Sequence, residues 1–258
     1  MIELYHAMHS TCSQKVRLCL AEKSLAFDSR LVAIDRKEHL TDWYLKLNPN
    51  GVVPTLVHDG AIVLDSSVIC EYLDEQFPEV RLTPRPALER ARMRTWMRYF
   101  EEVPTAAVRV PSFNGAFLSR FDGLDEERFR REQADIRPLR KHFYRRMGPK
   151  GFSTSDLEAS VEQLSSAVHR MDAALVRGPW LLGETYSLAD IVVAPLVDRM
   201  ADLGLDDLWN DGKRPAFAAW FERLRARPAF GEAFPKGARL TEFLRVTSAR
   251  ELLAPGSS

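Results

Sequence analysis

The stretch NPNGVVPTLVHDGAIVLDSSVICEYL, residues 48–73, decides which fold this chain can form. PTLVH and AIVL within it have strand-like composition, and Asp59 and Gly60 between them form a typical hairpin turn. Ser66 can cap a helix over the residues that follow, because apolar side chains recur there every three or four positions. The stretch therefore predicts two antiparallel strands and a helix, the second half of a small α/β layer.

The residues before this stretch predict the first half of the same layer. IELYH at residues 2–6 and FDSRLVAI at residues 27–34 have strand patterns. Apolar residues recur at helical spacing over residues 16–23 and again over residues 40–47. The predicted order is β-α-β-α-β-β-α, which makes residues 1–80 a small α/β domain.

The strand patterns end where RLTPRPA places two prolines among polar residues. We therefore predict a linker over residues 81–88 and an all-helical bundle domain over residues 89–258. Residues 155–176 have the most regular helical pattern, with apolar residues in alternating steps of four and three. Ser187 and Asp190 fit a helix-capping box ahead of an apolar run. The predicted fold class is α/β plus all-α.

Composition restricts the class of protein and the kinds of partner. With 45% hydrophobic and 28% charged residues, the 258-residue chain falls in the globular range. Lys plus Arg and Asp plus Glu both total 36, so no net charge favours a nucleic acid or an anionic membrane as partner. No apolar run reaches the roughly 18 to 20 residues that span a bilayer, and the opening MIELYHAMHS lacks a signal-peptide pattern. We therefore expect a cytoplasmic protein.

The cysteines and histidines do not form a metal-site pattern. The three cysteines, Cys12, Cys19 and Cys70, are an odd set without a CxxC motif, which disfavours a disulfide framework and a thiolate metal site. His6 and His9 lack a third ligand at suitable spacing, so a structural role is favoured for both. We predict no metal cofactor.

A basic run occupies residues 128–146, which are predicted to be helical. The run contains eight Lys or Arg residues against two acidic ones, with aromatic residues between them. Such a run can form a nucleic-acid surface, a solvated helix face or one wall of an anion site. The overall charge balance of the chain favours the second and third interpretations.

The residues from Ser10 to Ser13 lie where the first strand turns into the first helix. A helix N-terminus offers free N–H groups and a partial positive charge, which stabilise a bound anion or a thiolate. Ser10 can therefore act on an anionic partner, or can be a helix cap and nothing more. Cys12 is either a reactive thiol of low pKa or a small packed side chain.

Two further pairs of neighbouring residues, Val53 with Pro54 and Asp65 with Ser66, indicate recognition of a peptide. Pro54 opens a strand and cannot donate from its nitrogen, so it belongs at a sheet edge, where its peptide bond with Val53 can be cis. The amide and carbonyl of Val53 would then face outward and pair with an extended peptide. Asp65 and Ser66, at the start of the next helix, can together hold a zwitterionic amino acid.

These features together resemble the cytosolic glutathione transferases, and the resemblance extends over the whole chain. The motifs that carry it are STCSQKVR at 10–17, HLTDW at 39–43, NPNGVVPTL at 48–56, DSSVICEYL at 65–73 and YSLAD at 186–190. The resemblance implies a thioredoxin-like first domain that binds glutathione as co-substrate. It also implies a helical second domain with a site for a small hydrophobic substrate, and a homodimer.

The resemblance also implies roles for individual residues. Ser10 matches the serine that activates the glutathione thiol in the theta, tau and zeta classes, whereas in another register Cys12 or Ser13 takes this place. Asp65 stands where the family more often has Glu, so the carboxylate is on a shorter side chain. The residues that the resemblance assigns to glutathione binding are Thr11, His39, Val52, Val53, Pro54, Asp65 and Ser66.

The second substrate is expected to be apolar and aromatic. The resemblance places part of the helical domain opposite the glutathione site, although an aromatic stripe at helical spacing also fits a protein core. The candidate residues for this site are Trp96, Tyr99, Phe100, Val103, Arg109, Phe113 and Phe117. Within the family, the chain looks most like bacterial enzymes that use glutathione to cleave β-aryl ethers of lignin fragments.

Three other functions are compatible with the same resemblance. A zeta-like cis-trans isomerase would use glutathione and return it unchanged. A thiol reductase would use Cys12 and produce oxidised glutathione. A non-catalytic binding module would bind a ligand or a partner protein without chemistry.

Overall fold

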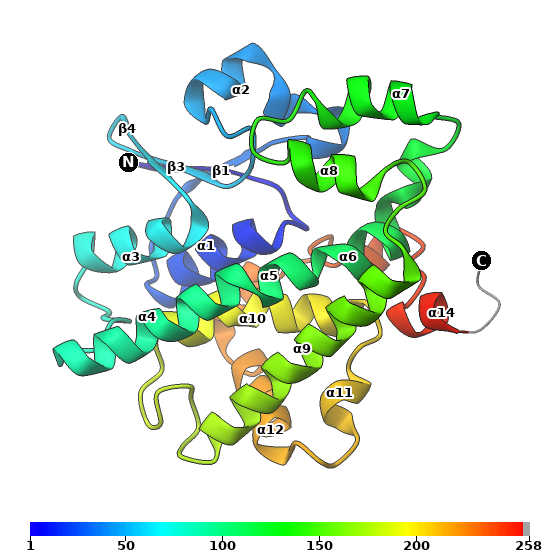
Figure 1. Ribbon diagram of the computed structural model, residues 1–258. Helices are drawn as coiled ribbons and strands as arrows, with labels where there is room; N and C mark the ends of the chain where they lie inside the picture. Colours follow the sequence, from blue (N-terminus) through cyan, green and yellow to red (C-terminus); the bar gives the residue numbers. More distant parts are fainter. Residues whose placement is uncertain (255–258) are drawn as a thin grey trace.

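The computed structural model describes residues 1–254, in which an α/β layer packs against a larger helical bundle (Figure 1). The last four residues of the predicted helical domain, 255–258, lie outside the described residues. Both parts of the predicted fold class, the thioredoxin-like layer and the helical domain, are confirmed. The predicted domain limits themselves stay a prediction, although α3 ends at Gln76 and α4 begins at Ala87.

The layer contains a four-stranded mixed sheet with the order β2-β1-β3-β4. Its strands are β1 (Ile2–His6), β2 (Asp28–Leu31), β3 (Thr55–His58) and β4 (Ala61–Leu64). β1 runs parallel to β2 and antiparallel to β3, with Leu4 opposite both Ser29 and Leu56. Asp59 and Gly60 adopt positive φ angles of 49° and 84°, which produces the tight hairpin between β3 and β4.

Three helices complete the layer in the predicted β-α-β-α-β-β-α order. They are α1 (Thr11–Glu22), α2 (Asp42–Leu47) and α3 (Ser66–Gln76). α1 and α3 pack against each other, and their apolar residues join those of β1 and β3 in one core. Because α1 starts only five residues after β1 ends, its N-terminus lies at the end of the sheet, beside the bundle.

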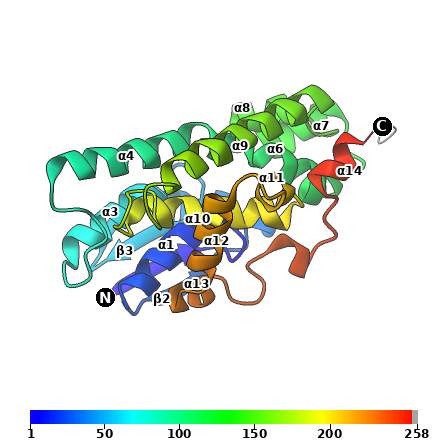
Figure 2. The ribbon, with the colours of Figure 1, turned by 90° about the horizontal axis from the view of Figure 1, so that it is seen from below.

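The bundle contains no named strand in the described part of the chain, apart from two isolated β-bridges between α9 and α10. Its α-helices are α4 (Ala87–Glu102), α5 (Pro104–Ala107), α6 (Arg109–Ser112), α7 (Glu126–Phe129), α8 (Lys141–Met147), α9 (Thr154–Leu175), α10 (Leu188–Asp202), α11 (Asp207–Asn210), α12 (Pro215–Arg225), α13 (Pro228–Ala233) and α14 (Ala249–Leu253). α10 packs against both α1 and α4, and Figure 2 shows it between the layer and the outer helices. The predicted capping box of Ser187 and Asp190 is present at its start.

One predicted helix is wrong. Residues 128–146 do not form a single helix but divide into α7, a π-helical turn at Arg130–Ala134 and α8. Pro138 lies between the last two. Proline lacks the N–H group and disfavours helical dihedrals at the residue before it. The interruption brings the chain back toward the segment before α2, where the Lys37 Nζ donates to the Glu132 carbonyl over 3.0 Å.

Polar contacts join the layer to the bundle on both sides of α1. Lys15 of α1 is fully buried and forms an ion pair with Glu101 of α4, which also accepts a 2.6 Å hydrogen bond from the Ser67 hydroxyl. At the other end of α1, Glu22 accepts from the Arg227 guanidinium over 2.6 Å. The orientation of α1 relative to the bundle is therefore set by charged as well as apolar contacts.

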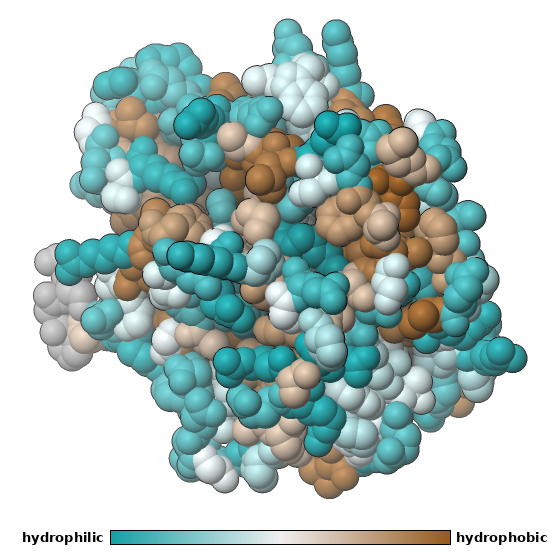
Figure 3. Space-filling model, turned by 180° about the vertical axis from the view of Figure 1, so that it is seen from behind, coloured by the Kyte–Doolittle hydropathy of each residue, from teal (hydrophilic) through white to brown (hydrophobic). Residues whose placement is uncertain are grey.

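Hydrophilic residues cover most of the face seen in Figure 3, and hydrophobic residues gather there in separate patches. This pattern is ordinary for a globular surface, since apolar atoms always contribute a large part of it. No helix within residues 1–254 is long and apolar enough to cross a membrane.

Candidate active site

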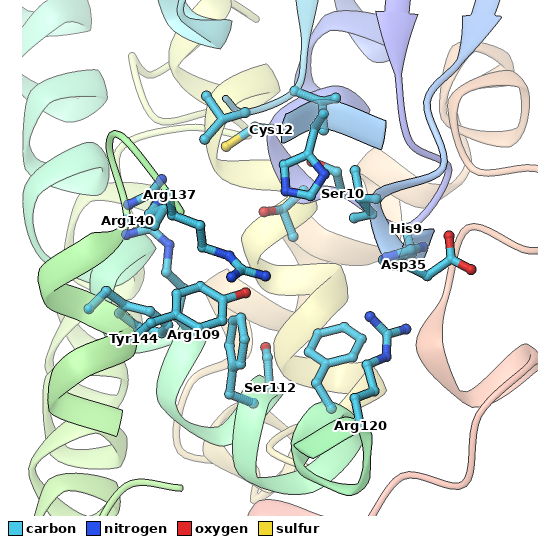
Figure 4. A pocket seen from close by; sticks show the side chains of 18 of the residues that line it. His9, Ser10, Cys12, Asp35, Arg109, Ser112, Arg120, Arg137, Arg140 and Tyr144 are labelled. Atoms are coloured by element: carbon cyan, nitrogen blue, oxygen red, sulfur yellow. The ribbon is translucent and has the colours of Figure 1, made fainter. Parts of the chain in front are cut away.

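A cavity of about 310 Å³ lies between the α/β layer and helices α6 and α8 (Figure 4). The layer contributes the turn between β1 and α1, the segment before α2 and residues 51–53. The bundle contributes residues from Val108 to Tyr144 together with Arg199 of α10. Both predicted domains therefore supply side chains to one site, and ligand pockets commonly lie at such domain interfaces.

Ser10 and Cys12 line this cavity, and Ser13 does not. Ser10 is the N-cap of α1, and its hydroxyl oxygen accepts a hydrogen bond from the Ser13 amide over 3.3 Å. Ser13 is fully buried, and its hydroxyl oxygen accepts from the Ala7 amide over 3.3 Å. Because capping uses only a lone pair of Ser10, its O–H stays available to donate into the cavity.

The backbone at Val53 is arranged to pair with a ligand. The Val53-Pro54 peptide bond is cis, and the preceding Val52 carbonyl accepts hydrogen bonds from the Tyr44 hydroxyl (2.8 Å) and the Asn48 side-chain amide (2.9 Å). Val52 and Val53 both line the cavity. Within residues 1–254, neither the amide nor the carbonyl of Val53 has a hydrogen-bond partner. An extended peptide bound here would satisfy both groups.

His39 lies on the α2 side of the cavity, where Lys37 and Arg137 surround it with positive charge. Its Nδ1 is buried without a partner among the described residues. Burial, followed by the charges of Arg137 and Lys37, lowers the pKa of His39 to about 4. At neutral pH His39 is thus an uncharged donor or acceptor beside two cations, a combination suited to binding a carboxylate.

Asp65 and Ser66 do not line this cavity but lie at the N-terminus of α3. Asp65 has a positive φ of 71° and caps α3, with one carboxylate oxygen accepting from the Ser67 and Val68 amides over 3.0 and 3.2 Å. The carboxylate is exposed, whereas Ser66 is buried. The resemblance assigns the γ-glutamyl end of glutathione to Asp65 and Ser66 and its glycine end to His39. Of these three residues, only His39 lines the cavity.

The structure divides the predicted hydrophobic-substrate residues into two groups. Arg109 and Phe113 line the cavity together with Phe117, whereas Trp96, Tyr99, Phe100 and Val103 do not. Phe100 belongs to the core, and Trp96 and Tyr99 lie beneath the Arg170 guanidinium at 5.2 and 4.2 Å. The expectation that α4 lines the site is therefore corrected. The aromatic spacing identified a helix face, and that face packs against α9 and the core.

Several lining residues were not singled out as site residues from the sequence. His9, Arg120, Arg137, Arg140 and Tyr144 all line the cavity. Burial, then the charges of Arg199 and Arg120, lowers the pKa of His9 to about 4, and its Nε2 is buried without a partner among the described residues. The basic run over residues 128–146 was the signal for Arg137, Arg140 and Tyr144, because one of its interpretations was the wall of an anion site. Arg120 lies outside this run.

The described residues contain no group of three or more His, Cys, Asp or Glu side chains that could hold a metal ion. Hydroxyl, thiol, imidazole and guanidinium groups line the site.

Comparisons with known proteins identify the family. Residues 9–76 match the glutathione S-transferase N-terminal domain, and residues 132–228 match the glutathione S-transferase C-terminal domain. Protein LigF of Sphingobium sp. (strain SYK-6) is 32% identical over 243 residues, which cover 92% of this chain and 95% of LigF. Glutathione S-transferase GstB of Escherichia coli (strain K12) is 27% identical over 231 residues, covering 89% of this chain and 95% of GstB.

Solved structures lead to the same family. The crystal structure of beta-etherase LigF from Sphingobium sp. strain SYK-6 superposes with a TM-score of 0.82 at 31% identity, covering 90% of this chain and 98% of that one. Glutathione transferase F7 from Populus trichocarpa superposes with a TM-score of 0.71 at 25% identity, covering 91% of this chain and 100% of that one. Sequence, fold and site therefore agree that this chain belongs to the glutathione S-transferase family.

Proposed function

We propose that this enzyme uses glutathione to cleave β-aryl ethers of aromatic ketones. The observation that carries the proposal is the composition of the cavity, which joins the N-terminus of α1 to a wall of aromatic side chains. The similarity to LigF, whose solved structure is described as a beta-etherase, supports the same reaction. In this proposal glutathione lies along the Val53 edge with its sulfur beside Ser10.

Activation of the thiol follows from the position of Ser10. A free thiol has a pKa near 8.5, so only a few per cent of it is ionised at about pH 7. Lowering that pKa by about two units makes the thiolate the main species, which corresponds to about 2.7 kcal/mol. A hydrogen bond donated by the Ser10 hydroxyl and the N–H groups of α1 together supply stabilisation of this size.

The proposed step is a displacement at the carbon that carries the aryloxy group. The thiolate sulfur attacks this carbon and forms a C–S bond as the C–O bond breaks. The electron pair of the broken bond leaves with the phenolate oxygen, which takes a proton from water. The products are a phenol and a glutathionyl ketone, and the substrate rings would rest against Phe113, Phe117 and Tyr144.

Product analysis tests the proposal. Incubation of the enzyme with glutathione and a β-aryl ether of a phenyl ketone should release phenol and the glutathionyl ketone in equal amounts. Conversion of a substrate into its cis-trans isomer, with glutathione returned unchanged, would assign an isomerase instead. Formation of oxidised glutathione by the native enzyme, but not by a Cys12→Ser variant, would assign a thiol reductase. Glutathione binding without any product would assign a binding module.

We also propose that the enzyme is a cytoplasmic homodimer that binds glutathione and a small aromatic substrate. The family resemblance supports this state, since members are commonly dimers with their sites beside the dimer groove. Light scattering after size exclusion should give twice the 29.4 kDa mass of one chain. A mass of one chain at working concentrations would contradict the dimer.

A further inference from the structure

The cavity concentrates positive charge in a chain whose total charge is zero. Among the described residues that line it, Asp35 is the one with a carboxylate. The cationic side chains of the lining are Lys37, Arg109, Arg120, Arg137, Arg140 and Arg199. An excess of this size in a partly enclosed site attracts anions.

Most of these cations already have partners in the protein. Arg199 lies 3.6 Å from the Asp202 carboxylate, and Lys37 donates to the Glu132 carbonyl. Arg137 donates to the Gln133 carbonyl and covers the Tyr144 ring at 3.9 Å. Arg120 lies over Phe117 at 4.6 Å and is close enough to Asp35 to feel its charge.

Arg109 and Arg140 differ from the others. Within the described part of the chain, neither guanidinium forms a hydrogen bond or an ion pair. Burial, and then the charge of Arg140, lowers the pKa of Arg109 to about 10, so the two groups repel each other at close range. Figure 4 shows both on one side of the cavity, with His9 and Asp35 on the other. Both side chains are half-buried. The Glu101 charge acts on Arg109, but Glu101 is already paired with Lys15, so both guanidinium groups keep donors available for an anion in the cavity.

The carboxylates of glutathione are expected elsewhere. His39 and Lys37 lie on the α2 side, where the glycine carboxylate is expected, and the γ-glutamyl end is expected at Asp65 and Ser66 of α3. Arg109 instead starts α6, one turn before Phe113. The Phe113 ring contacts those of Phe143 and Tyr144 at centroid distances of 5.0 and 5.5 Å. The unpaired cations thus adjoin the aromatic wall of the second substrate.

We propose that Arg109 and Arg140 bind a carboxylate carried by the aromatic substrate, so that the preferred ethers are aryl carboxylates rather than neutral molecules. This inference rests on the proposed function and specifies its substrate class. Two guanidinium groups match a carboxylate well, because each planar fork can donate two parallel hydrogen bonds. The aromatic ring of the same molecule would lie against Phe113 and Tyr144.

Two matched ethers test the inference. They differ only in carrying a carboxylate or its methyl ester on the ring attached to the ketone. At saturating glutathione, we expect kcat/KM to be at least about tenfold higher for the carboxylate, as hydrogen bonds to a charged group warrant. Arg140→Gln should lower the carboxylate value by about tenfold and that of the ester much less, so that the preference for the carboxylate is lost.

Two further variants make the result interpretable. Arg140→Lys keeps the charge but loses the fork, so it should retain an intermediate preference if it folds normally. Arg128→Gln removes an exposed cation from the same basic run and should leave both substrates unaffected. Equal kcat/KM values for carboxylate and ester in the native enzyme would overturn the inference. A change confined to the KM for glutathione in Arg140→Gln would also overturn it, because the arginines would then hold the tripeptide.

Calorimetry separates this inference from the proposed reaction. Binding of the carboxylate ether to glutathione-saturated enzyme should be at least about tenfold tighter than binding of the ester, and Arg140→Gln should abolish the difference. If this preference is present without release of phenol, the carboxylate site stands and ether cleavage is wrong. If both ethers bind with equal affinity and both release phenol, ether cleavage stands and the carboxylate site is wrong.

Discussion

Ser10 caps α1, and we propose a second role for the same hydroxyl in glutathione activation. The oxygen caps α1 by accepting from the Ser13 amide, and the O–H proton is available to the glutathione sulfur. Ser10→Ala should therefore raise the pH at which bound glutathione ionises by about one to two units, since one hydrogen bond to a thiolate is lost. A pH titration of the ultraviolet absorbance of the bound thiolate measures this shift.

The neighbouring residues provide controls for this prediction. Ser13→Ala should leave the ionisation of glutathione unchanged, because the Ser13 hydroxyl faces Ala7 and not the cavity. An unchanged profile in Ser10→Ala, with a shift in Cys12→Ala, would transfer the role to Cys12. This outcome would select the alternative register that the sequence leaves open.

Three histidines should make the folded chain sensitive to acid. His6, His9 and His39 each have a pKa lowered from 6.5 to about 4, and burial is the main cause in every case. Between these values the unfolded chain binds more protons, so the free energy of unfolding should fall as the pH decreases from about 6.5 to 4. Urea unfolding across this range, compared with His39→Gln, should show a shallower pH slope in the variant. Identical slopes would mean that His39 is not held neutral.

At the level of elements, the start of α10 is the most constrained helix terminus. Asp190 is fully buried and accepts from the Leu181 and Ser187 amides and from the Trp220 indole over 3.0, 3.1 and 2.9 Å. Asp190→Ala leaves these donors buried without an acceptor, so we expect a loss of at least about 3 kcal/mol in the free energy of unfolding. The variant can be compared with the native chain by urea denaturation.

The capping box of α9 is the matched control for this prediction. Its Asp156 accepts from the Ser153 amide over 3.3 Å, but both residues are accessible to water. Asp156→Ala should therefore cost only about 1 kcal/mol, as for an ordinary exposed cap. Equal losses in the two variants would show that burial adds nothing to the α10 cap.

The elements were predictable where local pattern decides them, and the site was predictable only in part. The Asp59-Gly60 hairpin and the regular spacing over residues 155–176 depend on neighbours in sequence, so both were found. Pro138 was overlooked as an interruption of the basic run. The aromatic residues of α4 have helical spacing, but spacing gives no information on which partner their face meets.

At the scale of the whole molecule, Lys15 and Glu101 connect the two domains. The Lys15 side chain is 0% exposed, so Lys15→Met leaves the Glu101 carboxylate without its cation at the interface. We expect a loss of about 3 kcal/mol in the free energy of unfolding. Lys15→Met combined with Glu101→Gln should recover part of this loss, because the neutral amide needs no counter-charge. A double-mutant cycle by urea denaturation measures the coupling, and strictly additive losses would contradict it.

An exposed ion pair of α12 serves as the control for this cycle. Arg225 and Glu222 lie 3.2 Å apart with side chains that are 51% and 71% exposed. Arg225→Gln should change the free energy of unfolding by less than about 0.5 kcal/mol, since water screens such pairs.

The active site is itself a property of the whole molecule. Ser10 and Arg140 are 130 positions apart, and no local pattern connects them, so their juxtaposition required the packing of α6 and α8 onto the layer. Of the residues assigned to glutathione, Thr11, His39, Val52 and Val53 line the cavity, and they lie in short motifs next to predicted strand ends and helix starts. Arg137 and Arg140 instead lie within the unpredicted break between Ala134 and Lys141.

A crystal structure of the chain with glutathione bound tests the central claim most directly. We expect the tripeptide to pair with the amide and carbonyl of Val53, with its sulfur within hydrogen-bond distance of the Ser10 hydroxyl. The glycine carboxylate should approach His39. A tripeptide bound away from Val53, or a sulfur atom remote from both Ser10 and Cys12, would contradict the account.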